Sequence, residues 1–266
     1  MTFRIASVSF LNARPLIHGL EQDTRVKLLL DVPSRLLDLL RTNQADVALL
    51  PVIDYQRLDN LTIIPAGGIG SDGATLTVRI FSRVPIAQIR SLACDPDSHT
   101  SVALARIILA RRHDVRPEFT DLARASDDPM QARLLIGDKV VCEGPRGYPH
   151  QLDLGDEWKS LTGLPFVFAT WMARSDVPDL PQLHDLLAAA KRRGMAELDA
   201  IIRDHGVPRG WPAPLARAYL TRHLTFDVGQ REIEAIRLFH RYAAEEGIIP
   251  QARPLNVISV PAASTS

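Results

Sequence analysis

The feature that most constrains this fold is the alternation of short apolar runs with segments of amphipathic helical character. An apolar run at residues 3–8 precedes Asn12-Ala13-Arg14-Pro15, where asparagine can cap a helix and proline is tolerated in the first turn. A second run at 27–32 precedes a helical pattern over 35–41, and a third follows at 47–50. Strands that alternate with helices in this way predict an α/β fold with mostly parallel strands.

The alternation restarts near residue 84. A short strand is expected at 92–94, a helix at 101–111, and further strands at 132–136 and 165–172. Helical segments follow beyond residue 181, and three glycines are expected to end them: Gly194, Gly206 and Gly247.

Two crossings, near residues 81–85 and 168–174, predict a molecule of two lobes. We expect residues 1–83 and 173–266 to form a discontinuous first lobe, and residues 84–172 to form a second lobe inserted into it. A cleft between two such lobes is a natural place for a small ligand.

Composition narrows the class of partner. Lys+Arg and Asp+Glu both number 31, so the formal net charge is zero, and a nucleic-acid partner, which needs a basic surface, is not expected.

No stretch approaches the roughly 20 apolar residues of a membrane span, and Arg4 interrupts any leader-like run, so we expect a cytoplasmic protein without a membrane partner. The eight scattered histidines and two distant cysteines, Cys94 and Cys142, predict no metal site, and the cysteines are expected to be buried apolar residues. The sequence does not predict an oligomeric state.

Polar residues gather where the expected strands end. In α/β sheets, ligands bind at the carboxyl ends of strands, where helix N-termini expose N–H groups. Hydroxyls and free N–H groups suit a carboxylate, so these positions predict a site for a small anion. The candidate substrate-binding residues are Ser9, Ser34, Ser98, His99, Thr100, Ser101, Gly137 and Asp138. Taken singly, Ser34 and Ser98 are better explained as helix N-caps, because capping is what serine commonly does at such a position.

Three residues carry further alternatives. Asn12 can cap a helix, or its amide can orient a substrate hydroxyl or carboxylate. His99 is suited to acid–base chemistry, with a position on the surface of the turn as the default. Asp138 can bind substrate or cap the next helix.

Several sequence blocks resemble one known family. They are Val8-Ser9-Phe10-Leu11-Asn12-Ala13-Arg14-Pro15-Leu16, Val32-Pro33-Ser34, Asp46-Val47-Ala48-Leu49-Leu50-Pro51, Asp95-Pro96-Asp97-Ser98-His99-Thr100-Ser101, Leu134-Leu135-Ile136-Gly137-Asp138 and the segment 153–169. In this order they resemble the chorismate dehydratases of the futalosine route to menaquinone. The resemblance implies a two-lobed fold like that of type II periplasmic solute-binding proteins, with a central ligand cleft.

The resemblance also implies a reaction and a site. The family dehydrates chorismate to 3-[(1-carboxyvinyl)oxy]benzoate, a hydro-lyase reaction that aromatisation drives without a cofactor. By similarity Asn12 is an essential active-site residue, and the substrate's own side-chain carboxylate acts as the base. Thr77, in Gly73-Ala74-Thr75-Leu76-Thr77-Val78, stands where the family has a second catalytic serine, and Phe10 stands where tyrosine is common.

Two alternatives remain open. The first is the enzyme of the same pathway that makes 1,4-dihydroxy-6-naphthoate, for which a histidine base in the second lobe is expected. The second is a solute-binding protein for small anions that performs no catalysis.

Overall fold

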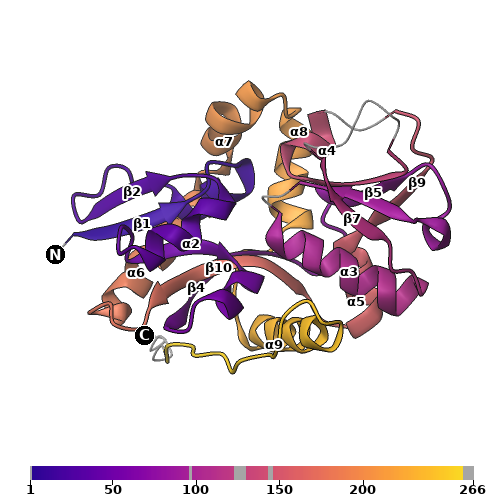
Figure 1. Ribbon diagram of the computed structural model, residues 1–266. Helices are drawn as coiled ribbons and strands as arrows, with labels where there is room; N and C mark the ends of the chain where they lie inside the picture. The colour runs from indigo at the N-terminus through magenta and orange to yellow at the C-terminus, as the bar shows by residue number, and fades with distance from the viewer. Residues whose placement is uncertain (1, 96–97, 123–129, 143–145, 260–266) are drawn as a thin grey trace.

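The chain forms two five-stranded mixed sheets, which lie side by side in Figure 1. The computed structural model describes residues 2–95, 98–122, 130–142 and 146–259. The first sheet has the order β2-β1-β3-β10-β4, and the second has the order β7-β6-β8-β5-β9. The strands of the first sheet are β1 (Phe3–Ser7), β2 (Val26–Leu30), β3 (Val47–Pro51), β4 (Leu61–Ser71) and β10 (Phe166–Arg174). The strands of the second are β5 (Val78–Ser82), β6 (Ser91–Cys94), β7 (Glu118–Asp121), β8 (Ala132–Ile136) and β9 (His150–Asp153).

Both sheets follow the same plan. Three neighbouring strands are parallel, and the fourth, which is β10 in the first sheet and β5 in the second, runs antiparallel to both of its neighbours. The expected α/β fold is therefore confirmed, with two antiparallel crossing strands added to the parallel ones. β5 pairs in the second sheet and β10 in the first, so the chain passes between the sheets at residues 72–77 and 163–165.

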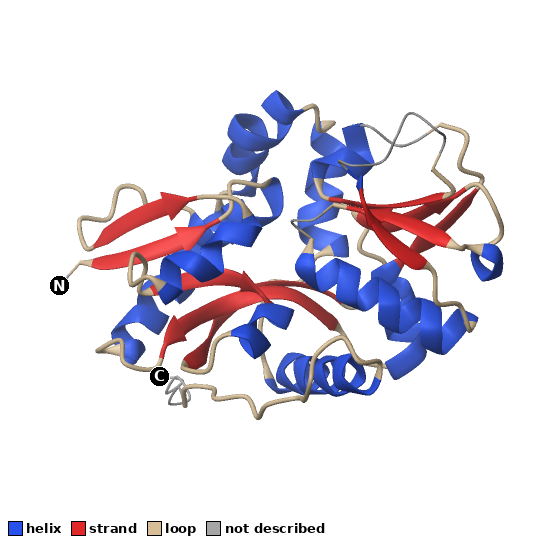
Figure 2. Ribbon diagram, viewed as in Figure 1, coloured by secondary structure: helices blue, strands red, loops and turns tan. Residues whose placement is uncertain are grey.

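Helices cover the sheets and join them (Figure 2). They are α1 (Arg14–Ile17), α2 (Pro33–Arg41), α3 (His99–His113), α4 (Asp138–Cys142), α5 (Leu154–Thr162), α6 (Leu180–Ala196), α7 (Leu198–Ile201), α8 (Ala213–Ala218) and α9 (Gln230–Glu245). Short helical turns include η1 (Leu11–Ala13), η2 (Val52–Arg57) and the wide turn η7 (Tyr219–His223). One continuous apolar core runs through both sheets, and Trp158 and Phe166 pack edge to face within it at 5.2 Å.

Of the three expected glycine stops, one is confirmed. Gly247 follows the end of α9 with φ +67°, a conformation that favours glycine. Gly194 instead lies inside α6, where a Cβ would come within 2.1 Å of the Pro15 carbonyl oxygen. That glycine allows α1 and α6 to approach closely, so the prediction of a stop there is wrong. Gly206 has φ −85° and closes a wide helical turn that continues into the next turn, so it is not a stop either.

Candidate functional site

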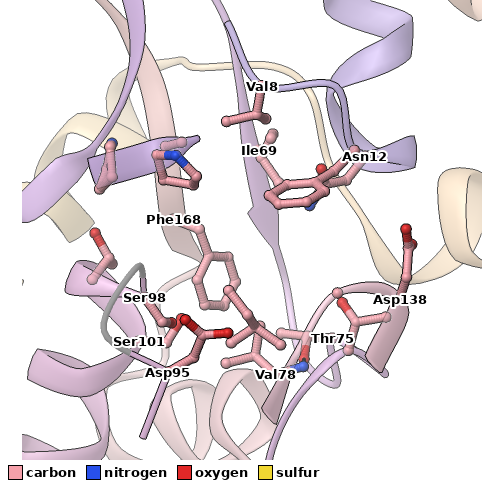
Figure 3. Close-up of a pocket in the computed structure, with 18 of the residues that line it drawn as sticks. Val8, Asn12, Ile69, Thr75, Val78, Asp95, Ser98, Ser101, Asp138 and Phe168 are labelled. Atoms are coloured by element: carbon pink, nitrogen blue, oxygen red, sulfur yellow. Dashed lines mark hydrogen bonds between the residues drawn. The ribbon is translucent and has the colours of Figure 1, made fainter. Parts of the chain in front are cut away.

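A cavity of about 410 Å³ lies between the two sheets. Its walls come from both: Val8, Leu49, Ile69 and Phe168 belong to the side of the first sheet, and Val78 lies on β5 of the second. Figure 3 shows an apolar middle around Phe168 and Ile69, with Asn12 and Asp138 toward one side and Ser98, Ser101 and Asp95 toward the other. The cavity therefore has two polar ends separated by apolar surface.

The first polar end is built around the Tyr219 hydroxyl. Thr77 Oγ1 donates a hydrogen bond to this hydroxyl at 2.9 Å, and the side chain of Asn12 also bonds it. Tyr219 is only 1% exposed. Burial raises the pKa of Tyr219 to about 12, although the hydrogen bonds from Thr77 and Asn12 act in the opposite direction. The hydroxyl therefore stays neutral and holds both side chains, while Asn12 Oδ1 itself is buried without a hydrogen-bond partner.

Trp211 connects this end of the cavity to the second sheet. Its ring stacks on that of Tyr219 at 4.8 Å, and its Nε1 donates a 2.6 Å hydrogen bond to Asp138 Oδ1. Asp138 is the first residue of α4, directly after β8 and Gly137. The aromatic pair thus ties the C-terminal part of the chain to the end of a strand in the second sheet.

The loop that carries Asn12 is fixed by two arginines. The carbonyl oxygen of Ser9 accepts hydrogen bonds from Arg14 Nε at 3.2 Å and from Arg209 Nη2 at 3.0 Å. Burial and the nearby charge of Arg209 lower the pKa of Arg14. These contacts hold the chain between β1 and η1, and so they set the position of Asn12.

The connection that carries Thr77 is fixed by Asp153. The Asp153 carboxylate accepts hydrogen bonds from the backbone N–H groups of Thr75 and Leu76, both at 2.9 Å. Leu76 has φ +68°, a strained conformation for a side chain of this kind, and these bonds hold it there. The same carboxylate caps α5, so one residue shapes both the crossing at 72–77 and the helix that leads to β10.

The second polar end is the start of α3. Ser98 precedes the helix, is 4% exposed, and has an Oγ without a hydrogen-bond partner. The first intrahelical bond runs from Val102 N to Ser98 O, which leaves the N–H groups of residues 99–101 without an intrahelical acceptor. The hydroxyls of Thr100 and Ser101 line the cavity beside them. An anion is the ligand that such an arrangement binds best.

Charged pairs flank this end. Lys139 forms an ion pair with Asp95, and both line the cavity. His99 Nδ1 lies 3.0 Å from Asp54 Oδ1, and Asp54 is completely buried. The expected surface position of His99 is therefore wrong: its side chain is only 20% exposed, and it lines the cavity.

Comparison with known proteins identifies the family of this chain. The family model described as "Menaquinone biosynthesis" matches residues 3–245. This chain belongs to that family. A relative named chorismate dehydratase, from Thermus thermophilus, is 28% identical over 211 residues, which cover 71% of this chain and 76% of that protein.

Solved structures support the fold of this menaquinone biosynthesis family member. A protein from Archaeoglobus fulgidus matches with a TM-score of 0.75 at 17% identity, covering 93% of this chain and 98% of the other. The periplasmic aliphatic sulphonate binding protein of Escherichia coli matches with a TM-score of 0.68 at 12% identity, covering 99% and 98%. A Candida albicans protein with the generic periplasmic binding protein fold has a TM-score of 0.65 at 12% identity and covers 99% of both chains. The expected periplasmic-binding-protein-like fold is confirmed.

Most of the sequence-derived candidates in this family member come together. Those that line the cavity are Asn12, Thr77, Ser98, His99, Thr100, Ser101, Gly137 and Asp138. Ser9 and Ser34 are not among the lining residues. Tyr219 and Trp211 were missed because nothing in a helical C-terminal segment signals that its aromatic residues reach a distant site.

The expected capping roles are wrong. α2 begins at Pro33, whose fixed φ suits the first helical position, so Val32 is the cap residue and Ser34 lies within the helix. Asn12 lies inside η1 and caps nothing, and Ser98 makes no side-chain capping bond. Both side chains are thereby available to the cavity.

No cluster of three or more potential metal-ligating side chains occurs among the described residues. Within the same residues, no helix has the length and apolar character to cross a membrane. Cys94 is buried, as expected, whereas the side chain of Cys142 lies outside the described residues.

Proposed function

We propose that this member of the menaquinone biosynthesis family is a chorismate dehydratase, which converts chorismate to 3-[(1-carboxyvinyl)oxy]benzoate and water. The observation that carries the proposal is the cavity with an anion-binding helix start at one end and the Asn12–Tyr219–Thr77 cluster at the other. The relative from Thermus thermophilus adds support, because the activity in its name fits a ligand with two carboxylates.

The start of α3 holds one carboxylate of the substrate. Three N–H groups that have no intrahelical acceptor and the unpartnered Ser98 Oγ donate hydrogen bonds to it, and the helix dipole adds a favourable field. A hydroxyl that donates to a carboxylate makes a charge-assisted bond of about 1.5–3 kcal/mol. Binding here relies on donors that need no counter-charge to be buried with them.

The Asn12 end orients the part of the ring that reacts. The amide of Asn12 offers a donor and an acceptor in one plane, and the Tyr219 and Thr77 hydroxyls fix that plane. Asn12 and Thr77 are therefore the proposed catalytic residues, because they hold the groups that change during elimination. Thr77 keeps the hydroxyl of the family's serine, and that hydroxyl is the atom that bonds Tyr219.

The apolar middle contributes by excluding water. Phe168, Ile69 and Val78 form surfaces against which a six-membered ring can pack. Fixing the ring between two polar ends places the reacting groups in one geometry and lowers the entropic part of the barrier. Aromatisation supplies the driving force, so we propose that no cofactor takes part.

The proposal is tested by incubating the purified protein with chorismate and analysing the products by absorbance and mass. A dehydratase forms an aromatic product lighter by one water, whereas a solute-binding protein returns chorismate unchanged. Asn12→Ala should abolish most turnover without changing the melting temperature by more than a few degrees. Full activity in that variant removes Asn12 from the mechanism.

A second variant addresses the carboxylate end. Ser98→Ala should raise KM by about tenfold or more, because one charge-assisted hydrogen bond is lost. Ser160→Ala, at an exposed position on α5, is the matched control and should leave KM unchanged. An unchanged KM in Ser98→Ala would place the carboxylate elsewhere in the cavity.

We also propose a cytoplasmic location, chorismate as the small-molecule partner, and no nucleic-acid partner. For the two lobes, we propose boundaries within the connections at 72–77 and 163–165, in place of the expected ones after residues 83 and 172, because β5 pairs in the second sheet and β10 in the first. Limited proteolysis that cuts first within these connections would support the boundaries, and early cuts inside β5 or β10 would contradict them.

A further inference from the structure

Asp54 is a buried charge that the proposed reaction does not yet use. It lies in η2, next to the end of β3, and its side chain is 0% exposed. Its two carboxylate oxygens lie 3.0 and 3.1 Å from His99 Nδ1, and Arg57 Nη1 lies 3.0 Å from Oδ1. A carboxylate buried so completely is costly unless it is paired, and here the partners are an imidazole and a guanidinium.

The pairing determines how His99 presents its ring. Arg57 Nη1 lies 3.0 Å from Nδ1 as well as 3.0 Å from Asp54 Oδ1. An ionised carboxylate only accepts hydrogen bonds, so Nδ1 carries a proton to bond Asp54, and the Arg57 guanidinium then donates to Asp54 rather than to the ring. Nε2 is then the nitrogen left for other partners, and it makes no hydrogen bond to a described residue. His99 lines the main cavity and also a second cavity of about 470 Å³, beside Arg57 and Arg106. A carboxylate that holds one ring nitrogen leaves the other nitrogen available to a molecule in the cavity. Histidines that transfer protons are typically held in this way.

Dehydration requires a proton at the departing hydroxyl, and the described lining offers few donors for it. Tyr219 keeps its proton, because burial raises its pKa to about 12. Lys139 is held in the ion pair with Asp95, and Asp138 accepts a hydrogen bond from Trp211. His99 is the remaining titratable side chain of the described lining, and histidine is the side-chain type that most readily exchanges protons near neutral pH.

We infer that His99, held by Asp54, is the general acid that protonates the departing hydroxyl of a ring acid bound in the main cavity. This inference rests on the proposed dehydration. The proton on the carbon that bears the enolpyruvyl ether passes to the substrate's own side-chain carboxylate. The electron pair of that C–H bond first stays on the ring as a carbanion delocalised toward the ring carboxylate, and it then forms the new ring double bond as the neighbouring C–O bond breaks. The oxygen takes a proton from His99 Nε2 and leaves as water. The proton that the substrate carboxylate took from the ring carbon then passes to Nε2, which restores His99 for the next turnover.

The test separates the two proton transfers. His99→Gln and Asp54→Asn are compared with wild type for kcat, KM and melting temperature, and reactions run in D₂O are stopped early so that unreacted chorismate can be analysed by mass. His113→Gln is the matched control, because His113 lies on the same helix and also pairs with a carboxylate, with Nε2 3.1 Å from Glu157 Oε2, but does not line the cavity.

His99→Gln should lower kcat by about 10²–10⁴-fold, the usual contribution of general acid catalysis. Because deprotonation survives while departure of the hydroxyl is slow, recovered chorismate should gain one deuterium at the ring carbon. Asp54→Asn should lower kcat at least about tenfold with KM within about threefold, since only the orientation of the ring is lost. His113→Gln should match wild type and show no deuterium gain.

Two results would overturn the inference. A folded His99→Gln variant with kcat within about threefold of wild type would show that His99 donates no proton, and loss of turnover without deuterium gain would assign the first proton transfer to it instead. His99→Asn is made alongside, so that a failure of one variant to fold leaves the question answerable. If wild type itself does not dehydrate chorismate, the proposed function fails, which is a separate outcome.

Discussion

Replacing Tyr219 with phenylalanine removes one oxygen atom and tests whether that atom holds the active end of the cavity together. The ring stack on Trp211 survives, because phenylalanine keeps the aromatic ring. The Thr77 hydroxyl loses its 2.9 Å acceptor, and it lies in a residue that is only 2% exposed, so water cannot easily replace it. Asn12 loses the same partner, but it is only partly buried, so water can reach it more easily than it reaches Thr77.

The size of the effect follows from these contacts. One buried polar group left unsatisfied costs about 1–3 kcal/mol. For a chain of this size, each kcal/mol of lost stability lowers the melting temperature by about 2–4 °C. The kcat should fall more than stability suggests, by about 10–100-fold, because a displacement of about 1 Å in Asn12 is enough to spoil the geometry. Steady-state kinetics with chorismate and thermal unfolding measure the two effects separately.

A matched tyrosine supplies the control. The Tyr55 hydroxyl donates to the Pro254 carbonyl at 3.1 Å and accepts from Asn256 N at 2.8 Å, and Tyr55 is 4% exposed. Tyr55→Phe should therefore lower the melting temperature similarly while leaving kcat unchanged, because this hydroxyl does not border the cavity. If Tyr219→Phe lowers only the melting temperature and keeps full kcat, the cluster is structural and our reasoning about Asn12 is refuted.

Three further predictions concern stability. Burial lowers the pKa of His240 to about 4, so between pH 6.5 and pH 4 the unfolded chain binds a proton at this residue that the folded chain does not bind. The free energy of unfolding should therefore drop by about 3 kcal/mol as pH falls over that range. Denaturant titrations at a series of pH values should show that His240→Gln loses this dependence. Burial raises the pKa of Tyr219 to about 12, so wild type should lose stability relative to Tyr219→Phe as pH rises from 10 to 12; parallel curves would contradict that assignment. Gly194→Ala should destabilise the protein by about 1–3 kcal/mol, because the new Cβ would lie 2.1 Å from the Pro15 carbonyl oxygen. This cost should exceed the gain from alanine's higher helix propensity. An increase in melting temperature would refute the close packing of α1 on α6.

Much of the architecture could be predicted from local pattern alone. The strands at 3–8, 47–50 and 132–136 were expected because short apolar runs bounded by turn residues are typical of buried strands. β4 was not expected, because Gly67, Gly68 and Gly70 interrupt the run of apolar side chains that is typical of a strand. A Cβ on Gly68 would lie 2.7 Å from the Ala169 carbonyl oxygen, so the tight approach of β10, which no local pattern encodes, makes glycine necessary in this strand.

The site was predictable in part for a physical reason. Polar residues that follow strands collect at one edge of a sheet, so Asn12, Ser98 and Asp138 could be grouped from their positions in the sequence. The partners that lie far apart in the sequence could not be predicted. Tyr219 lies 142 residues from Thr77, and Asp54 lies 45 residues from His99. Such pairings depend on how separate elements pack, and single-sequence periodicity carries no information about that.

The central claim is that this cavity turns chorismate into an aromatic acid. The most direct measurement is a proton NMR time course of purified wild-type protein with chorismate in chelator-treated buffer without nucleotide. We predict that ring signals of the disubstituted benzoate grow as the diene signals disappear, in equal amounts and at a rate proportional to protein concentration. Diene signals that persist unchanged, even where chorismate binds, would contradict the account.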